Sequence, residues 1–240
     1  MRRAIPFTAL ILLAAFVLSG FSSQEIIVGR RRATASPSRT VVQTVANSKF
    51  GTNPSQTIAL GASLASGDVL ILHQYGDSGA TMGNPSGCVT SWNTNGNDTA
   101  TTNQQDFYGV SNTTGTCNVT ISATGTSKNI AADIVQCHGC SGTPDGTSSF
   151  DREANCSPTC NWPSLTTSSD GSLVCGSLIN GTAGNTASAP WVAAYSGSDS
   201  QGTKHFVTCY ARSPAGANAT PGYTPGGGGN NGYRTTQGMQ

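Results

Sequence analysis

The sequence is poor in charged residues and has very little lysine and glutamate. Charged residues make up 10% of the 240 residues, and only three are lysines and two are glutamates. Both residue types favour helices on protein surfaces, so their scarcity argues against a mainly helical protein. The formal net charge of +1 gives little attraction to nucleic acid, whose binding requires several phosphates to be neutralised at once. We therefore expect no nucleic-acid partner.

A hydrophobic run long enough to cross a membrane is also missing. The longest run, Leu10 to Leu18, is about half of the ~20 residues that a spanning helix needs. It follows two arginines and precedes a group of small residues that begins at Ser19, which is the order of a secretory signal peptide. We predict a signal peptide over residues 1–23, a secreted or cell-surface protein, and no membrane insertion.

The residues after the predicted signal peptide lack the strand patterns of the later chain. Arg30, Arg31 and Arg32 are followed by Ala, Thr, Ser and Pro up to about Thr40. This composition predicts a flexible linker over residues 24–40. A pro-segment that is cut after the arginines is the alternative.

Motifs for catalysis are absent as well. His73, His138 and His205 lie in separate segments, and no HExxH pair or Gly-x-Ser-x-Gly elbow occurs. This favours a protein that is not an enzyme. The alternative is a polysaccharide-active enzyme, which needs two carboxylates a few ångströms apart. Asp151 and Glu153 are the candidates, because alternate residues of a strand share a face.

The chain is rich in short apolar runs separated by Gly, Asn, Asp and Ser, a pattern typical of strands and turns. The spacing of about ten residues predicts an all-β, antiparallel β-sandwich of the jelly-roll or Ig-like kind, as a single domain over residues 41–240. The predicted strands are Val41 to Val45, Gln56 to Leu60, Asp68 to Tyr75, Cys88 to Trp92, Gln104 to Val110, Cys117 to Ser122, Ile130 to Cys137, Ser172 to Ile179, Trp191 to Tyr195, Lys204 to Arg212 and Gly232 to Met239.

Two of these strands read as continuous apolar runs after similar turns. Val69 to Leu72 follows Ala-Ser-Gly-Asp, and Leu173 to Cys175 follows Ser-Asp-Gly-Ser. Continuous apolar runs indicate strands that are covered on both faces. Their separation of about a hundred residues suggests corresponding strands in two halves of the domain.

The order of several strand-and-turn segments resembles that of uncharacterised secreted bacterial β-sandwich domains of surface and extracellular proteins. The resemblance covers residues 41–240 and implies no catalytic residue, because that group has no established active-site motif. The eight cysteines are a departure from it. The segments that carry the resemblance are Ala65 to Ile71, Phe107 to Val110, Cys117 to Ile121 and Thr166 to Val174.

The even number of cysteines in an exported chain predicts a disulfide framework. Cys88 and Cys117 begin nearby strands, and Cys175 and Cys209 lie in runs that could be neighbours. The other four surround one loop, with a spacing close to that of zinc sites built from four thiolates. Zinc is the alternative there, although an oxidising compartment favours disulfides. These four are Cys137, Cys140, Cys156 and Cys160.

The loop from Ser141 to Asn155 holds the densest charge after the linker, including Asp145, Asp151 and Glu153. With Trp162 beside it, the loop is the predicted contact surface. The expected function is a non-catalytic adhesion, matrix or carbohydrate-binding module, whose partner is an extracellular glycan or a surface protein.

No cofactor is predicted, although calcium could bind carboxylates near turns. The candidates are Asp68, Asp77 and Asp145. A third reading of function is a filament subunit, in which the strand Val41 to Val45 pairs with the sheet edge of a neighbouring copy.

Overall fold

The computed structural model describes residues 38–98, 103–152, 158–181, 183–226 and 232–240. The predicted signal peptide and nearly all of the predicted linker lie outside these residues. The chain from Pro37 to Gln240 is one unit, and its described part contains strands and no helix. No helix of the described residues could therefore span a bilayer.

The strands are arranged in chain order as follows. They are β1 (Thr40–Gly51), β2 (Ser55–Ala59), β3 (Val69–Gly76), β4 (Thr81–Met82), β5 (Asn93–Asp98), β6 (Gln104–Val110), β7 (Asn118–Thr124), β8 (Lys128–His138), β9 (Ser149–Arg152), β10 (Ser172–Ile179), β11 (Thr186–Ala187), β12 (Val192–Ser198), β13 (Lys204–Arg212), β14 (Tyr223–Thr224) and β15 (Tyr233–Met239).

These strands form two halves with the same strand order. In the first half, β1 to β8, an inner sheet of order β1-β8-β3-β6-β5 is paired with an outer sheet of order β2-β7-β4. In the second half, β9 to β15, the inner sheet has the order β9-β15-β10-β13-β12 and the outer sheet is β14-β11. A bridge from Cys160 to Tyr223 takes the place of β2. This is jelly-roll topology. The predicted all-β, antiparallel fold is confirmed, and the structure has a sandwich in each half where the sequence predicted one sandwich.

The turns before β3 and β10 show the same correspondence in detail. Gly67 and Gly171 both have a positive φ, 92° and 75°, which glycine adopts without strain. The Gly67 amide donates to the carbonyl of Ser111 at 2.9 Å, and the Gly171 amide donates to that of Arg212 at 2.7 Å. Both acceptors lie at the ends of matching strands, β6 and β13. The internal repeat suggested by the two turn sequences is therefore present in the structure.

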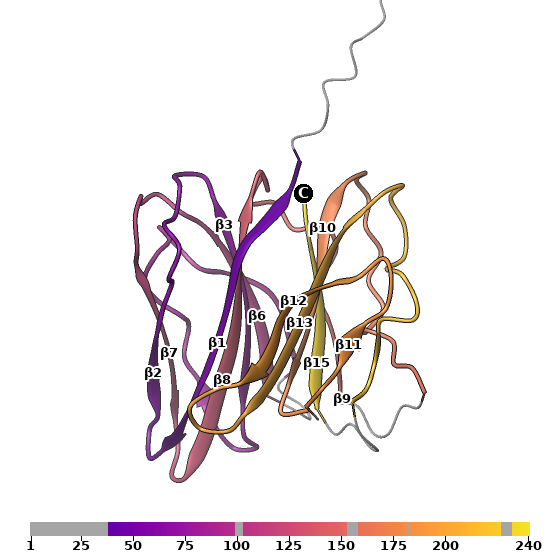
Figure 1. Ribbon diagram of the computed structural model, residues 1–240. Coiled ribbons are helices and arrows are strands. Elements are labelled where there is room, and N and C mark those ends of the chain that lie inside the picture. Colours follow the sequence, from indigo (N-terminus) through magenta and orange to yellow (C-terminus); the bar gives the residue numbers. More distant parts are fainter. Residues whose placement is uncertain (1–37, 99–102, 153–157, 182, 227–231) are drawn as a thin grey trace, which may run out of the picture. The chain divides into compact units, whose positions relative to one another are not determined.

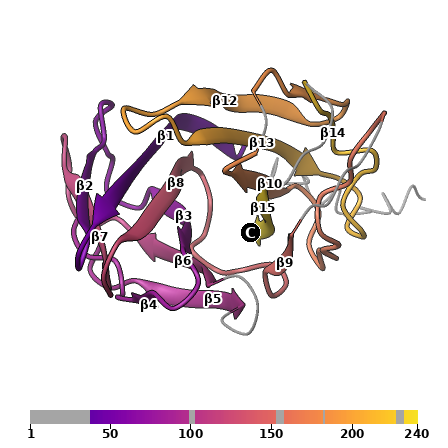
Figure 2. The same ribbon diagram turned by 90° about the horizontal axis from the view of Figure 1, so that it is seen from below.

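The two inner sheets face each other, which gives four layers of strands (Figures 1 and 2). Side chains such as Leu70 of β3 pack into the core of the first half, and those such as Val174 of β10 pack into the core of the second. The alternate residues, such as Val69 and Leu173, meet between the inner sheets. Strands β3 and β10 are therefore buried on both faces, which explains their continuous apolar runs.

One predicted strand is wrong, and five strands were not predicted, namely β5 and four short ones. The segment Cys88 to Trp92 is not a strand, because Cys88 has a positive φ of 65° and the strand β5 begins at Asn93. Residues 93–98 are polar and gave no apolar pattern. The strands β4, β9, β11 and β14 have two to four residues each, too few for a period to be recognised.

Candidate functional site

Trp162 lies in the core of the second half, with 2% of its surface exposed. Its ring packs on the rings of Tyr223 and Phe206, with centroid distances of 4.7 and 6.2 Å. A Cβ atom at Gly176 would lie 2.3 Å from the Trp162 ring, so only glycine fits there. The expectation that Trp162 presents its ring to a ligand is therefore wrong. The glycine inside the apolar run of β10 was the sequence signal for this close packing.

Asp145 is also buried, with 1% exposure, and holds the turn before β10. Its carboxylate accepts hydrogen bonds from the amides of Ser168 and Ser169, at 2.7 and 3.0 Å, and from the hydroxyls of Ser168 and Ser172, at 2.6 and 2.5 Å. Burial raises the pKa of Asp145, but these hydrogen bonds outweigh it and lower the pKa below its usual range. Both carboxylate oxygens serve the chain's own donors, so Asp145 has a structural role.

The other predicted loop carboxylates do not form a described pair. Asp151 lies on β9, and its carboxylate is 2.6 Å from the guanidinium of Arg234. Glu153 lies outside the described residues. Of the calcium candidates, Asp68 accepts from His138 Nδ1 at 2.8 Å, and Asp77 accepts from the amide of Asn129 at 2.7 Å. Among the described residues, no group of three or more His, Cys, Asp or Glu side chains is arranged so that it could hold a metal ion.

The cysteines form the predicted staples. Cys175 is bonded to Cys209 on the neighbouring strands β10 and β13, as predicted, and Cys88 is bonded to Cys117, although Cys88 is not in a strand. Cys137 is bonded to Cys140, so these two sulfurs are not thiolates and the four-thiolate zinc site is not formed. Cys160 is disulfide-bonded as well, and Cys156 lies outside the described residues. Disulfides of this number indicate an oxidising environment.

A buried polar cluster lies between the inner sheets, and sequence reasoning missed it. His205 of β13 is 2.7 Å from Asp133 of β8 through Nδ1 and 3.1 Å from Asp199 through Nε2. The Ser177 hydroxyl donates to Asp133. Burial lowers the pKa of His205, but the charges and hydrogen bonds of the two carboxylates outweigh it and raise the pKa. Each ring nitrogen is within hydrogen-bond distance of a carboxylate, so both are engaged by the protein's own side chains.

A second buried contact joins the halves nearby. His73 of β3 is 2.7 Å from Asp106 of β6, and the Thr235 hydroxyl of β15 donates to the same carboxylate. His73 is 2% exposed, so a ligand has no access to its ring. These two polar contacts are therefore structural, since they link side chains of the first half to those of the second.

A groove of about 410 Å³ opens between the inner sheets along one side of the unit. It lies between β1 and β12, which are the edge strands of the two inner sheets on this side (Figures 1 and 2). We call it the β1–β12 groove. Two of the four exposed large hydrophobic side chains of the described residues, Val42 and Val192, line it. A volume of this size is within the range of ligand sites.

The walls of the β1–β12 groove are apolar, with a few polar groups. Val42 and Val192 are 45% and 67% exposed. Arg39 is the charged residue among those that line the groove, and its Nε atom and the hydroxyl of Thr44 are buried without a hydrogen-bond partner. The complete lining consists of Arg39, Val41, Val42, Gln43, Thr44, Leu173, Val192, Ala193, Ala194, Cys209, Tyr210 and Ala211.

Each edge strand carries a β-bulge within the groove. The ladder of β1 and β8 shifts register between Val41 and Gln43, and that of β12 and β13 between Ala193 and Tyr195. The extra residues are Val42 and Ala194, and both line the groove. Bulges re-aim side chains and interrupt continuous pairing of an edge with another strand. Their positions favour a ligand site here over a long strand-to-strand contact.

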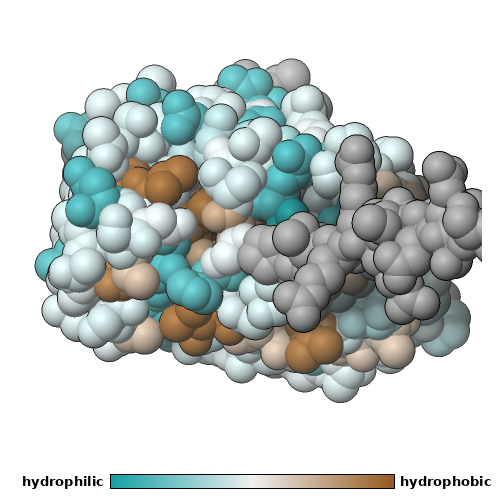
Figure 3. All heavy atoms as spheres, turned by 90° about the horizontal axis from the view of Figure 1, so that it is seen from above, coloured by the Kyte–Doolittle hydropathy of each residue, from teal (hydrophilic) through white to brown (hydrophobic). Residues whose placement is uncertain are grey.

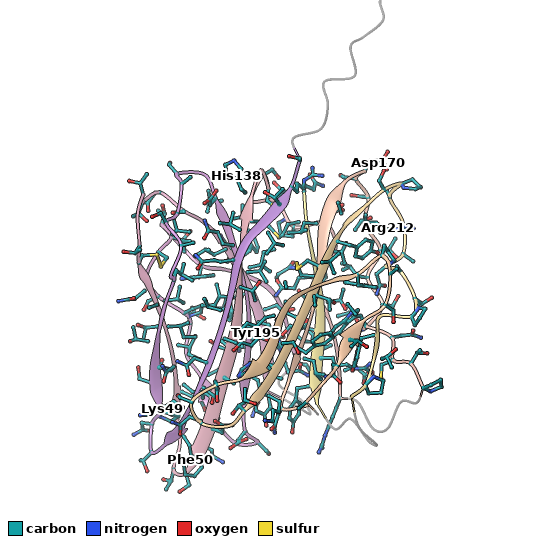
Figure 4. All side chains as sticks on the ribbon, viewed as in Figure 1. Lys49, Phe50, His138, Asp170, Tyr195 and Arg212 are labelled. Atoms are coloured by element: carbon teal, nitrogen blue, oxygen red, sulfur yellow. A yellow bond between two sulfur atoms is a disulfide. The ribbon has the colours of Figure 1, made fainter. Side chains whose placement is uncertain are left out.

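The remaining exposed side chains are spread out. Seen from the end at which β1 begins, hydrophobic residues form separate small patches (Figure 3). His138 lies at this end of the first half, and Asp170 and Arg212 lie at the same end of the second half (Figure 4). Lys49 and Phe50 lie at the far end of β1, away from Arg39 and the groove (Figure 4).

Comparisons of the chain with models of protein families, with curated proteins and with solved structures give no match.

Proposed function

We propose that the protein is a non-catalytic, secreted or cell-surface binding module that acts in adhesion, and that the β1–β12 groove is its contact site. The observation that carries the proposal is the opening between two sheet edges, lined by exposed valines and by buried polar atoms without partners. The disulfides and the predicted signal peptide support an extracellular location.

The chemistry of the groove favours a protein segment over a glycan as the ligand. Sugar sites use exposed aromatic faces, whereas Tyr210, the one aromatic side chain that lines the groove, is 8% exposed and packs against Trp191. The apolar walls with a few polar groups instead suit a short extended peptide, because the bulges interrupt only continuous pairing along the whole edge. The valine and alanine side chains of the walls suit small apolar side chains.

The enzyme and filament readings have less support. Asp151 is paired with Arg234 and faces no second carboxylate among the described residues. The filament reading requires β1 to pair with another chain over its length, and the bulge at Val42 interrupts that edge. Both readings remain as outcomes of the test below.

The proposal is tested by applying the purified protein to an array of capped octapeptides and to a glycan array. We expect binding to peptides that alternate apolar and polar residues, no binding to glycans, and no release of reducing sugar from polysaccharides. Val192→Asp should weaken peptide binding at least ten-fold, since it places a charge on the groove wall. Phe50→Asp, at an exposed position outside the groove lining, is the matched control and should bind as the wild type does.

Glycan binding, or soluble sugar that is released by wild-type protein, would overturn the proposal. So would equal peptide binding by Val192→Asp and Phe50→Asp, because the contact site would then lie elsewhere. Concentration-dependent assembly that Val192→Asp abolishes would favour the filament reading instead.

A further inference from the structure

Because of the internal repeat, the β1–β12 groove can be compared with the matching place on the opposite side of the same unit. There, the other two edges of the inner sheets, β5 and β9, are closed against each other. Asn95 Nδ2 donates to the hydroxyl of Ser148 at 2.9 Å, and the Ser148 amide donates to the carbonyl of Asn95 at 3.2 Å. Both residues are 8% exposed. A ring carbon of Phe150 lies 3.0 Å from where a Cβ atom of Gly96 would be, so the described parts of β5 and β9 pack closely here.

The strand registers identify the counterpart of Asn95 in the groove. Strand β5 has its register shift between Thr94 and Gly96, with Asn95 as the extra residue. Strand β12 has its shift between Ala193 and Tyr195. Since β5 and β12 are matching strands of the two halves, Ala194 occupies the place of Asn95.

The counterpart of Ser148 follows from the registers of β9 and β1. Phe150 of β9 pairs with Thr235 of β15, and Ala46 of β1 pairs with Asp133 of β8. Thr235 pairs with Ser177 of β10, and Asp133 pairs with His73 of β3. Since Ser177 and His73 occupy corresponding positions of the two central strands, Thr235 and Asp133 match. Phe150 therefore matches Ala46, and counting back two residues matches Thr44 of β1 with Ser148, which directly precedes β9.

The groove thus lacks the donor of a hydrogen bond that is formed on the closed side. On the closed side, a side-chain amide donates to a hydroxyl. In the groove, the amide is replaced by the methyl group of Ala194, and the hydroxyl of Thr44 is buried without a partner. A buried polar group without a partner is costly, so a ligand that donates to it gains affinity. The comparison with Asn95 and Ser148 indicates an amide N–H as the group that a ligand supplies at this position.

The positive charge of Arg39, at the upper end of the groove, indicates a second chemical group of the ligand. The Nη1 atom of Arg39 donates to the carbonyl of Asp170 at 3.2 Å, whereas Nε is buried without a partner. No acidic residue lines the groove with it. A carboxylate of the ligand complements this guanidinium, and such charged hydrogen bonds are stronger than neutral ones.

We propose that the β1–β12 groove binds an extended polypeptide segment that donates an amide hydrogen bond to the Thr44 hydroxyl and places a carboxylate beside Arg39. This inference rests on the proposed function and adds the chemistry of its ligand. The amide is that of an Asn or Gln side chain or of the peptide main chain, and the carboxylate is that of Asp or Glu. The apolar side chains of the segment lie against Val42 and Val192.

The probe is the capped hexapeptide acetyl-Val-Asn-Val-Thr-Val-Asp-amide, titrated calorimetrically into the wild-type protein. Thr44→Val keeps the shape of the side chain and removes the hydroxyl, so binding should weaken about five-fold, the factor that one neutral hydrogen bond contributes. Arg39→Glu should weaken binding at least ten-fold and should restore it for the same peptide with Asp replaced by Lys.

Ala194→Asn tests the comparison between the two sides directly. The new amide should bond to Thr44 as Asn95 bonds to Ser148, which closes the groove. We expect peptide binding to fall at least ten-fold while the midpoint of thermal unfolding is unchanged or higher. Ala59→Asn, at an exposed position of β2, is the matched control and should bind as the wild type does. Thr44→Val and Arg39→Glu provide the test if Ala194→Asn does not fold.

The outcomes separate this inference from the proposed function. If the hexapeptide binds but neither Thr44→Val nor the charge exchange at Arg39 changes its affinity, the inference is wrong and the proposed function stands. If neither the hexapeptide nor any peptide of the array binds the wild type, both are wrong.

Discussion

Replacement of His205 by Gln should destabilise the interface between the two halves and lower the free energy of unfolding. His205 is fully enclosed between Asp133 and Asp199, which are themselves buried. A glutamine amide is neutral, so the variant leaves two buried carboxylates without their cation. Removal of one partner of a buried ion pair costs about 3 to 5 kcal/mol. For a chain of this size, that loss lowers the midpoint of thermal unfolding by roughly 6 to 20 °C.

The pH dependence of the same variant tests the cause of the loss. The pKa of His205 is raised in the folded protein, so its contribution is complete below its unfolded pKa of about 6.5 and is lost as the pH rises through the folded pKa. Burial raises the pKa of Asp199, but its hydrogen bonds, including one with His205, lower it overall. Its contribution is therefore present above about pH 4 and is lost as the pH falls through the lowered pKa.

Urea unfolding of wild type and His205→Gln, measured between pH 4 and pH 9, provides the assay. The free energy of unfolding of the wild type should fall as the pH rises above about 6.5, and that of the variant should not. The reasoning is refuted if the variant unfolds at the wild-type urea concentration, or if the fall above pH 6.5 persists without the imidazole.

Two further predictions concern the core of the second half and the disulfides. Trp162→Ala should lower the free energy of unfolding by about 3 to 5 kcal/mol, because it leaves a cavity between Tyr223 and Phe206; a near-neutral result in urea unfolding would contradict this packing. Removal of the Cys88–Cys117 disulfide, which spans 29 residues, should cost about 3.6 kcal/mol by loop entropy, against about 1.6 kcal/mol for Cys137–Cys140, which spans three. Paired Cys→Ser variants measure both values by urea unfolding, and the reverse order would argue against chain entropy as the main cause.

The sequence predicted the strands and turns that are set by the pattern of residues close together in the chain. The alternation of Cys117 to Ser122 and the buried run of β3 set their strands, and the turns at Gly67 and Gly171 indicated the repeat. Two disulfides followed from strands that could be neighbours. Trp162 was misplaced because its burial depends on Gly176, a glycine in a strand that is distant in sequence.

The candidate site could not be predicted from the sequence. Thr44 and Ala194 both line the β1–β12 groove, whereas Asn95 and Ser148 are hydrogen-bonded to each other on the opposite side. These residues lie in or directly beside four edge strands, and their correspondence appears only when the registers of both inner sheets are known. A threonine and an alanine that are 150 residues apart carry no local pattern. The same applies to His205, whose two carboxylates come from different halves of the chain.

The central claim is that the β1–β12 groove is the contact site of a binding module. Its most direct test is a titration of isotope-labelled protein with the hexapeptide, followed by the shifts of backbone amide resonances in NMR spectra. The account predicts shifts at residues of β1 and β12 that line the groove, among them Thr44, Val192 and Ala194, and unchanged resonances for Asn95 and Ser148 on the closed side. Shifts that centre on β5 and β9, or on the loops at either end of the unit, would contradict it.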